Sequence, residues 1–229
     1  MSRPSLVSHP SPNHDARPGD APIDMLVLHY TGMRDAKSAL DRLCDPAAEV
    51  SAHYLIGEDG STLALVPEEL RAWHAGQAHW RGRTDINARS IGIELVNPGH
   101  EFGYRPFPPA QMAALADLCL GILSRHAIPP GNVVGHADIA PARKQDPGEL
   151  FDWSWLASLG IGLWPEISHR IPDALSAQAM LGRYGYDPGL DAKTVLTAFQ
   201  RHFRPNLCDG NADSDTLGRL ASLLEQTGR

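Results

Sequence analysis

Apolar stretches in the first two thirds of the chain predict a β-sheet. Residues 23–30 (IDMLVLHY) form a nearly continuous apolar run of strand length, which is typical of a strand buried on both faces. Residues 52–56 and 62–66 flank a Gly-Glu-Asp-Gly turn and therefore predict a hairpin. Residues 90–96 alternate Ile and Leu with other residues, as a strand does, and residues 132–135 predict one more short strand.

Apolar residues at helical spacing predict helices that would cover this sheet. The longest predicted helix runs from Pro109 to His126, and the first turn of a helix tolerates a proline. Its apolar stripe consists of Met112, Leu115, Cys119, Ile122 and Leu123. Shorter helices are predicted at residues 35–43 and 153–159. The predicted fold class is therefore α/β, a central sheet flanked by helices.

The pattern changes near residue 170, where helical periodicity replaces the mixture of strands and helices. Three short segments each begin with an acidic residue suited to capping and predict a small three-helix bundle. These segments are residues 173–184, 191–203 and 213–226. The chain is therefore predicted to have an N-terminal arm rich in Pro, Ser and Asp, followed by two domains. The arm is predicted to be either extended and wrapped on the surface or disordered. The predicted boundaries are 1–22 for the arm, 23–168 for the larger domain and 169–229 for the helical domain.

Composition and charge narrow the classes of function. The 229 residues carry a net charge of −7, which argues against broad nucleic-acid binding because phosphate contacts need clustered Lys and Arg. No apolar run reaches the 18 residues of a membrane span. The three cysteines are too few for a disulfide framework. An N-terminal segment without an apolar signal region or a lipid-attachment cysteine predicts a cytoplasmic location, and oligomeric state stays open.

Three polar residues stand where predicted strands end or in a proline-flanked loop. His29 lies near the end of the first strand, His136 directly follows the last one, and Asp146 comes ten residues later. Two histidines and a carboxylate are the ligands that an open catalytic zinc site needs, with water in the fourth position. A histidine at a strand end is more often a structural residue held by a hydrogen bond, so spacing alone leaves both interpretations open.

Two further charged residues could take part in chemistry at such a site. Glu94 interrupts an apolar strand, and burial would raise its pKa toward that of a general base. An edge-strand glutamate that is partly exposed is the equally simple alternative. Lys144 lies two residues before Asp146 and could stabilise an oxyanion, although loop lysines are usually just solvated.

Five ordered motifs resemble the zinc-dependent N-acetylmuramoyl-L-alanine amidases, in particular their AmiD/AmpD-like branch. The motifs are LHYTG (28–32), HYLI (53–56), AWHAG (72–76), RSIGIELVN (89–97) and GHADIAPARKQDPG (135–148). The segment VLTAFQRHFRP (195–205) is similar to the peptidoglycan-binding helical domain that follows the catalytic domain in AmiD-like members. The resemblance implies a mixed β-sheet flanked by helices, as in peptidoglycan-recognition proteins, with a small C-terminal three-helix bundle.

The resemblance also implies the roles of individual residues. His29, His136 and Asp146 would hold zinc, Glu94 would be the catalytic base, and Lys144 would stabilise the negative charge that develops on the substrate carbonyl. The bond cleaved would be the amide between the lactyl group of N-acetylmuramic acid and the L-alanine of the stem peptide. Residues that could contact sugar or peptide in the groove are His53, Trp73, His74 and Asn97.

Three alternatives stay open at this point. The chain could be a non-catalytic peptidoglycan-recognition module of the same fold, although such modules lack a complete ligand set. As an enzyme, it could recycle 1,6-anhydro-muropeptides, which a cytoplasmic location favours, or trim intact peptidoglycan, which the helical domain favours. An endopeptidase that cuts within the stem peptide is the third alternative.

Overall fold

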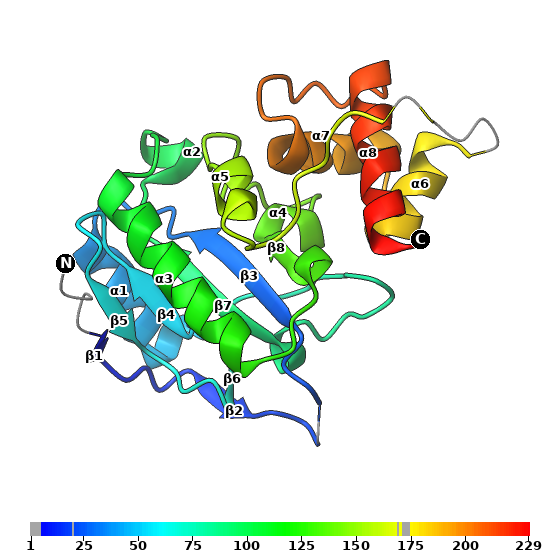
Figure 1. Cartoon of the computed structure of the whole chain (residues 1–229). Coiled ribbons are helices and arrows are strands. Elements are labelled where there is room, and N and C mark those ends of the chain that lie inside the picture. Colours follow the sequence, from blue (N-terminus) through cyan, green and yellow to red (C-terminus); the bar gives the residue numbers. More distant parts are fainter. Residues whose placement is uncertain (1–5, 20, 169, 171–174) are drawn as a thin grey trace.

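The computed structural model describes residues 6–19, 21–168, 170 and 175–229, and these residues include two β-sheets (Figure 1). The strands are β1 (Leu6–Ser8), β2 (His14–Ala16), β3 (Met25–Tyr30), β4 (Tyr54–Ile56), β5 (Thr62–Ala64), β6 (Leu70–Ala72), β7 (Ser90–Leu95) and β8 (Val133–Gly135). The larger sheet has the order β1-β5-β4-β7-β3-β8, and β2 pairs with β6 in the other. Only the β4–β5 hairpin is antiparallel in the larger sheet, so the predicted mixed sheet is confirmed.

The helices follow the predicted pattern closely. Within the described residues they are α1 (Ala36–Cys44), α2 (Gly99–Phe102), α3 (Pro109–Arg125), α4 (His136–Ile139), α5 (Trp153–Ser158), α6 (Ala177–Tyr184), α7 (Ala192–Phe203) and α8 (Ser214–Thr227). Single 3₁₀ turns occupy Pro46–Ala48, Asn87–Arg89 and Pro130–Asn132. The three helices predicted in the larger domain correspond to α1, α3 and α5 within one residue at each end. The four-residue helices α2 and α4 were not predicted, because they are too short to show a period.

One segment differs from the prediction, and another distinguishes between two predicted alternatives. The first helix of the tail begins at Ala177 rather than at residue 173, because the Ser176 hydroxyl caps it by accepting a hydrogen bond from the Ala179 amide; residues 173 and 174 lie outside the described part. Where it is described, the N-terminal segment lies extended on the surface, the first of its two predicted alternatives, because β1 and β2 add to the two sheets. Buried Asn13 also ties it down by donating to two backbone carbonyls of the segment after α1.

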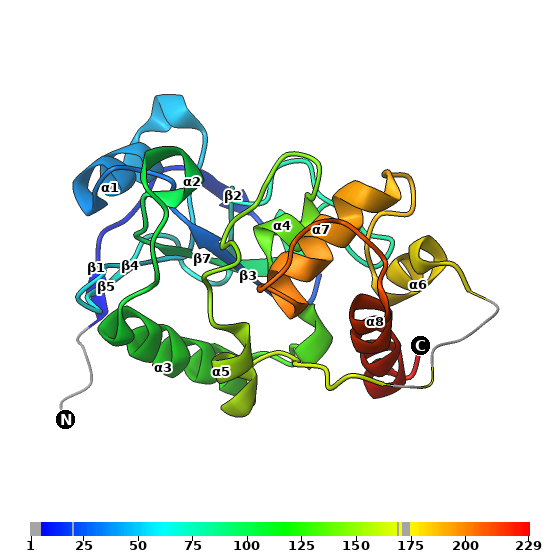
Figure 2. The same ribbon diagram turned by 90° about the horizontal axis from the view of Figure 1, so that it is seen from above.

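Alternation along β3 decides which side of the sheet carries chemistry. Leu26 and Leu28 point toward α3 and join the core under that helix. Met25 and Val27 point to the other face and join a second core, which continues into the C-terminal bundle formed by α6, α7 and α8. His29 follows this alternation, so its side chain lies on the face away from α3. Figure 2 shows α7 of the C-terminal bundle lying beside α4 on that side.

Among the described helices, none is both long enough and apolar enough to cross a membrane. The boundary near residue 169 between the larger domain and the helical domain stays a prediction.

Glu68, in the loop before β6, joins three elements, which gives a prediction about stability. Its carboxylate accepts hydrogen bonds from Tyr54 on β4, from Arg125 at the end of α3 and from His126. Burial alone would raise the pKa of Glu68, but these partners lower it to about 2. Because the folded pKa lies below the unfolded value, the stabilisation is present above about pH 4.5 and is lost as pH falls toward 2.

We therefore expect Glu68→Gln to lower the free energy of unfolding at pH 7 by about 1–2 kcal/mol, after allowance for the solvent exposure of the pairs. Urea unfolding of both proteins at several pH values measures the difference, which should shrink as the pH is lowered from 7 to 3. A difference that stays constant with pH would show that the ionised carboxylate is not the source of the stability.

Candidate active site

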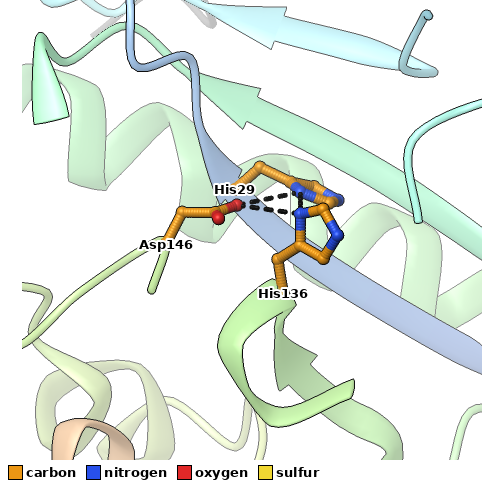
Figure 3. A group of neighbouring side chains, drawn as sticks. All are labelled: His29, His136 and Asp146. Carbon is orange, nitrogen blue, oxygen red and sulfur yellow. Dashed lines mark hydrogen bonds and ion pairs between the residues drawn. The ribbon is translucent and has the colours of Figure 1, made fainter. Parts of the chain in front are cut away.

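The predicted metal ligands meet at one edge of the sheet. Because β3 and β8 are parallel neighbours, His29 at the end of β3 lies beside His136, the first residue of α4. The loop after α4 returns Asp146 to the same point (Figure 3). The two Nδ1 atoms are 3.0 Å apart, and each lies 3.1 Å from Oδ2 of Asp146. All three side chains are buried.

This group fits a zinc ion in spacing and in charge. Zinc bonds of about 2.0–2.1 Å in tetrahedral geometry place ligand atoms roughly 3.3 Å apart, close to the observed separations. Burial, helped by the neighbouring His136, lowers the pKa of His29 to about 4, so its imidazole is neutral near pH 7. Burial alone would raise the pKa of Asp146, but the two histidines hold it well below its usual range. Neutral imidazoles and an ionised carboxylate are the forms that bind a metal.

Hydrogen bonds behind the ligands leave their Nδ1 atoms free. Nε2 of His29 lies 3.0 Å from Nδ1 of His74, and Nε2 of His74 lies 3.1 Å from the Ser90 hydroxyl. Ser90 in turn donates to the carbonyl of Ile86 at 2.7 Å. The proton arrangement that satisfies this chain puts the His29 proton on Nε2, and His136 reaches the Ala75 carbonyl with Nε2 at 3.1 Å in the same way. Both histidines therefore present an unprotonated Nδ1 to the same point.

The close approach of His74 to the sheet requires a glycine on β7. A Cβ atom at Gly92 would lie 2.5 Å from Cγ of the His74 ring. Burial lowers the pKa of His74 well below its usual value, so this ring is also neutral. The motifs AWHAG and RSIGIELVN thus lie side by side in the fold. The first supplies His74 behind His29, and the second supplies Gly92, which leaves room for the His74 ring.

Glu94 and Lys144 lie at the same site. The register of β3 and β7 places Glu94 opposite His29 and on the same face of the sheet. Glu94 and Lys144 both line a cavity of ≈ 500 Å³ that His136 and Asp146 also line. Oε2 of Glu94 is buried and has no hydrogen-bond partner among the described residues. Burial and the charge of Asp146 raise its pKa well above the usual value, as a general base requires.

Comparison with known proteins identifies the family. The sequence profile of the Amidase_2 family, described as N-acetylmuramoyl-L-alanine amidase, matches residues 19–149. This chain belongs to the N-acetylmuramoyl-L-alanine amidase family. The N-acetylmuramoyl-L-alanine amidase AmiD of Escherichia coli is 43% identical over 235 residues, covering 90% of this chain and 84% of AmiD.

Two solved structures extend this similarity to three dimensions. AmiD from E. coli in complex with the substrate anhydro-N-acetylmuramic acid-L-Ala-D-γ-Glu-L-Lys superposes with a TM-score of 0.81 at 42% identity, covering 93% of each chain. AmpDh3 from Pseudomonas aeruginosa, in complex with anhydromuramic pentapeptide, gives a TM-score of 0.81 at 36% identity, covering 90% of this chain and 92% of AmpDh3. The predicted amidase family and fold are therefore confirmed.

The four residues predicted to line the groove of the amidase fall into two pairs. Trp73 and His74 do line the cavity, and their contact with substrate stays a prediction. His53 and Asn97 are completely buried and are not among the described residues of the cavity wall. His53 instead accepts a hydrogen bond from the Gly92 amide, and Asn97 donates to the Arg105 carbonyl. Both side chains hold the backbone behind the site, which a motif alone does not reveal.

Sequence reasoning missed other residues of the amidase cavity. Tyr30, Arg42, His100 and Arg143 all line it. Tyr30 and Arg143 lie directly beside His29 and Lys144 in sequence, and this adjacency was the available signal. Arg42 on α1 and His100 on α2 could not be assigned to the cavity from the sequence, because only the folded chain brings these two helices to it.

Proposed function

We propose that this amidase hydrolyses the amide between the lactyl group of (1,6-anhydro-)N-acetylmuramic acid and the L-alanine of the stem peptide, with zinc held by His29, His136 and Asp146. The observation that carries the proposal is the buried group of His29, His136 and Asp146 at the wall of a cavity that Glu94 also lines. Oε2 of Glu94 has no hydrogen-bond partner in the described part of the chain. The anhydro-muropeptides bound to AmiD and AmpDh3 support the substrate class, since both proteins are similar to this chain over nine tenths of its length.

Glu94 and Lys144 have different roles in the proposed reaction. When bound, zinc supplies a Lewis acid that polarises the carbonyl and lowers the pKa of water. Glu94 accepts a proton from the attacking water, and because burial raises its pKa it is a stronger base than an exposed carboxylate. The same carboxyl group then donates the proton to the leaving nitrogen of L-alanine. The ammonium group of Lys144 stabilises the negative charge on the former carbonyl oxygen, a contribution typically of about 3–4 kcal/mol.

Incubation of the purified protein with zinc and a defined 1,6-anhydro-muropeptide tests the proposal. Liquid chromatography with mass spectrometry should detect a free peptide that begins with L-alanine and an anhydro-sugar without peptide. A chelator should stop the reaction and added zinc should restore it. A muropeptide that binds but stays intact would instead support the recognition module, and cleavage within the stem peptide would support the endopeptidase.

The role of the C-terminal helical domain is a separate proposal. We propose that the C-terminal bundle docks on peptidoglycan, as the similarity of its sequence to peptidoglycan-binding domains suggests. Sedimentation of the protein with purified sacculi would test this, and no co-sedimentation would contradict it.

A cytoplasmic location stays a prediction that cell fractionation would test.

A further inference from the structure

A buried polar contact joins the C-terminal bundle to the short helix that carries a proposed zinc ligand. Asp138 on α4 is 1% exposed. Its Oδ1 accepts a hydrogen bond from the Tyr186 hydroxyl at 2.6 Å, and its Oδ2 accepts one from Nδ1 of His202 at 2.7 Å. Tyr186 follows α6 and His202 lies on α7, so both donors belong to the bundle that lies beside α4 (Figure 2).

The same carboxylate holds the backbone at the zinc site. Oδ2 of Asp138 also accepts the backbone amide of Gly135 at 2.7 Å, and Gly135 directly precedes the ligand His136. One residue after His136, the amide of Ala137 donates to the carbonyl of Asp146 at 2.9 Å. Asp138 therefore fixes the turn from which His136 projects, and the following amide links that turn to the second ligand.

Packing alone does not explain why the two hydrogen-bond donors to Asp138 are a histidine and a tyrosine. The His202 ring is stacked against Trp153 and Phe203, with ring centroids 3.8 Å away in each case, a place that a phenylalanine would also fill. Nε2 of His202 is buried and has no hydrogen-bond partner among the described residues, which is unfavourable for a histidine. What only the histidine supplies is the Nδ1 donor to Asp138. Burial raises the pKa of Tyr186 well above its usual value, so its hydroxyl stays a donor as well.

The bundle touches the ligand loop at a second point. Nη2 of Arg201, the neighbour of His202 on α7, lies 3.3 Å from Oε1 of Gln145, which stands between Lys144 and Asp146. Nε of Arg201 is also 3.8 Å from the carboxylate of Glu149, further along the same loop. One face of α7 thus contacts both α4 and the loop that carries Asp146.

We infer that Asp138, held by Tyr186 and His202, is a positioning residue for the zinc ligand His136, so that the C-terminal bundle forms part of the scaffold of the metal site. This inference rests on the proposed zinc site, and it gives the bundle a role in addition to docking. Partners behind a ligand typically change metal affinity by 10–100-fold, and Asp138 acts through the backbone rather than on the imidazole. Loss of one donor should therefore weaken zinc binding by about 10-fold, at the lower end of that range.

Zinc dissociation constants of the folded variants, measured by competition with a chromogenic chelator, test this role. Tyr186→Phe removes one donor without changing shape, and His202→Phe removes the other while keeping the stacked ring. His202→Asn keeps a side-chain N–H donor near the position of Nδ1 and should bind zinc more tightly than His202→Phe. The control is Tyr184→Phe, which removes a hydroxyl from the same buried cluster at a ring packed on Trp80; it should bind zinc like the wild type.

Urea unfolding of the zinc-free variants separates positioning from simple stabilisation. The inference is overturned if Tyr186→Phe and His202→Phe lower the free energy of unfolding but bind zinc as tightly as Tyr184→Phe. A wild-type protein that binds no zinc would overturn the proposed function and this inference together. Tight wild-type binding with unchanged variants would overturn this inference alone.

Discussion

Replacing Glu94 by glutamine should lower kcat on a muropeptide by about 10²–10⁴-fold, the range typical of a lost general base, while zinc stays bound. Glutamine keeps the shape of the side chain but cannot take a proton from water. The three proposed ligands stand on β3, α4 and the following loop, so a change on β7 leaves the ligand set intact. Steady-state kinetics together with the zinc content of the purified protein measures both effects.

Glu101 provides a matched control for this result. It lies on α2, lines the same cavity and is exposed, so its carboxylate is solvated, whereas that of Glu94 is buried from water. Glu101→Gln should leave kcat close to that of the wild type. If Glu94→Gln kept a nearly wild-type kcat, Glu94 would not be the base.

Replacing His136 by alanine should remove both zinc and activity. The change takes away one of the three ligand atoms. The zinc affinity should therefore fall by more than the 10–100-fold that is typical when a hydrogen-bond partner of a ligand is removed. The change also removes one of the two neighbours that hold the pKa of the buried Asp146 low, and a carboxyl group that keeps its proton binds metal less well. Equilibrium dialysis with metal analysis measures the zinc, and release of peptide measures the activity.

His9 is the control for His136, because it is an exposed histidine in the N-terminal segment. His9→Ala should keep zinc and activity, and circular dichroism should show that both variants are folded. A folded His136→Ala protein that still binds zinc with wild-type affinity would contradict the proposed ligand set.

The main elements of the fold could be predicted because long periodic segments report burial directly. The stripe on residues 109–126 predicted α3, and the run IDMLVLHY predicted a strand buried on both sides, which β3 is. The short strands β1 and β2 could not be predicted, because their side chains are mostly exposed and their pairing depends on edges made by β5 and β6. The start of α6 depended on a cap at Ser176 rather than on periodicity.

The candidate site was predictable where one motif holds several functional residues together. GHADIAPARKQDPG contains His136, Lys144 and Asp146, and the structure brings His29 to them because β3 and β8 are adjacent. The contact between Asp138 and the bundle joins positions 48 and 64 residues apart. A single sequence gives no signal for such pairs, because it contains no information on which turn of a helix meets which loop.

The most direct test of the central claim is hydrolysis of an anhydro-muropeptide in water labelled with ¹⁸O, followed by mass spectrometry of both products. Attack of water at the lactyl carbonyl predicts one labelled oxygen in the carboxyl group of the peptide-free sugar and no label in the peptide. Label in a carboxyl group of the peptide fragment that stays on the sugar would show cleavage within the stem. That result, or the absence of any product from zinc-loaded protein, would contradict the account.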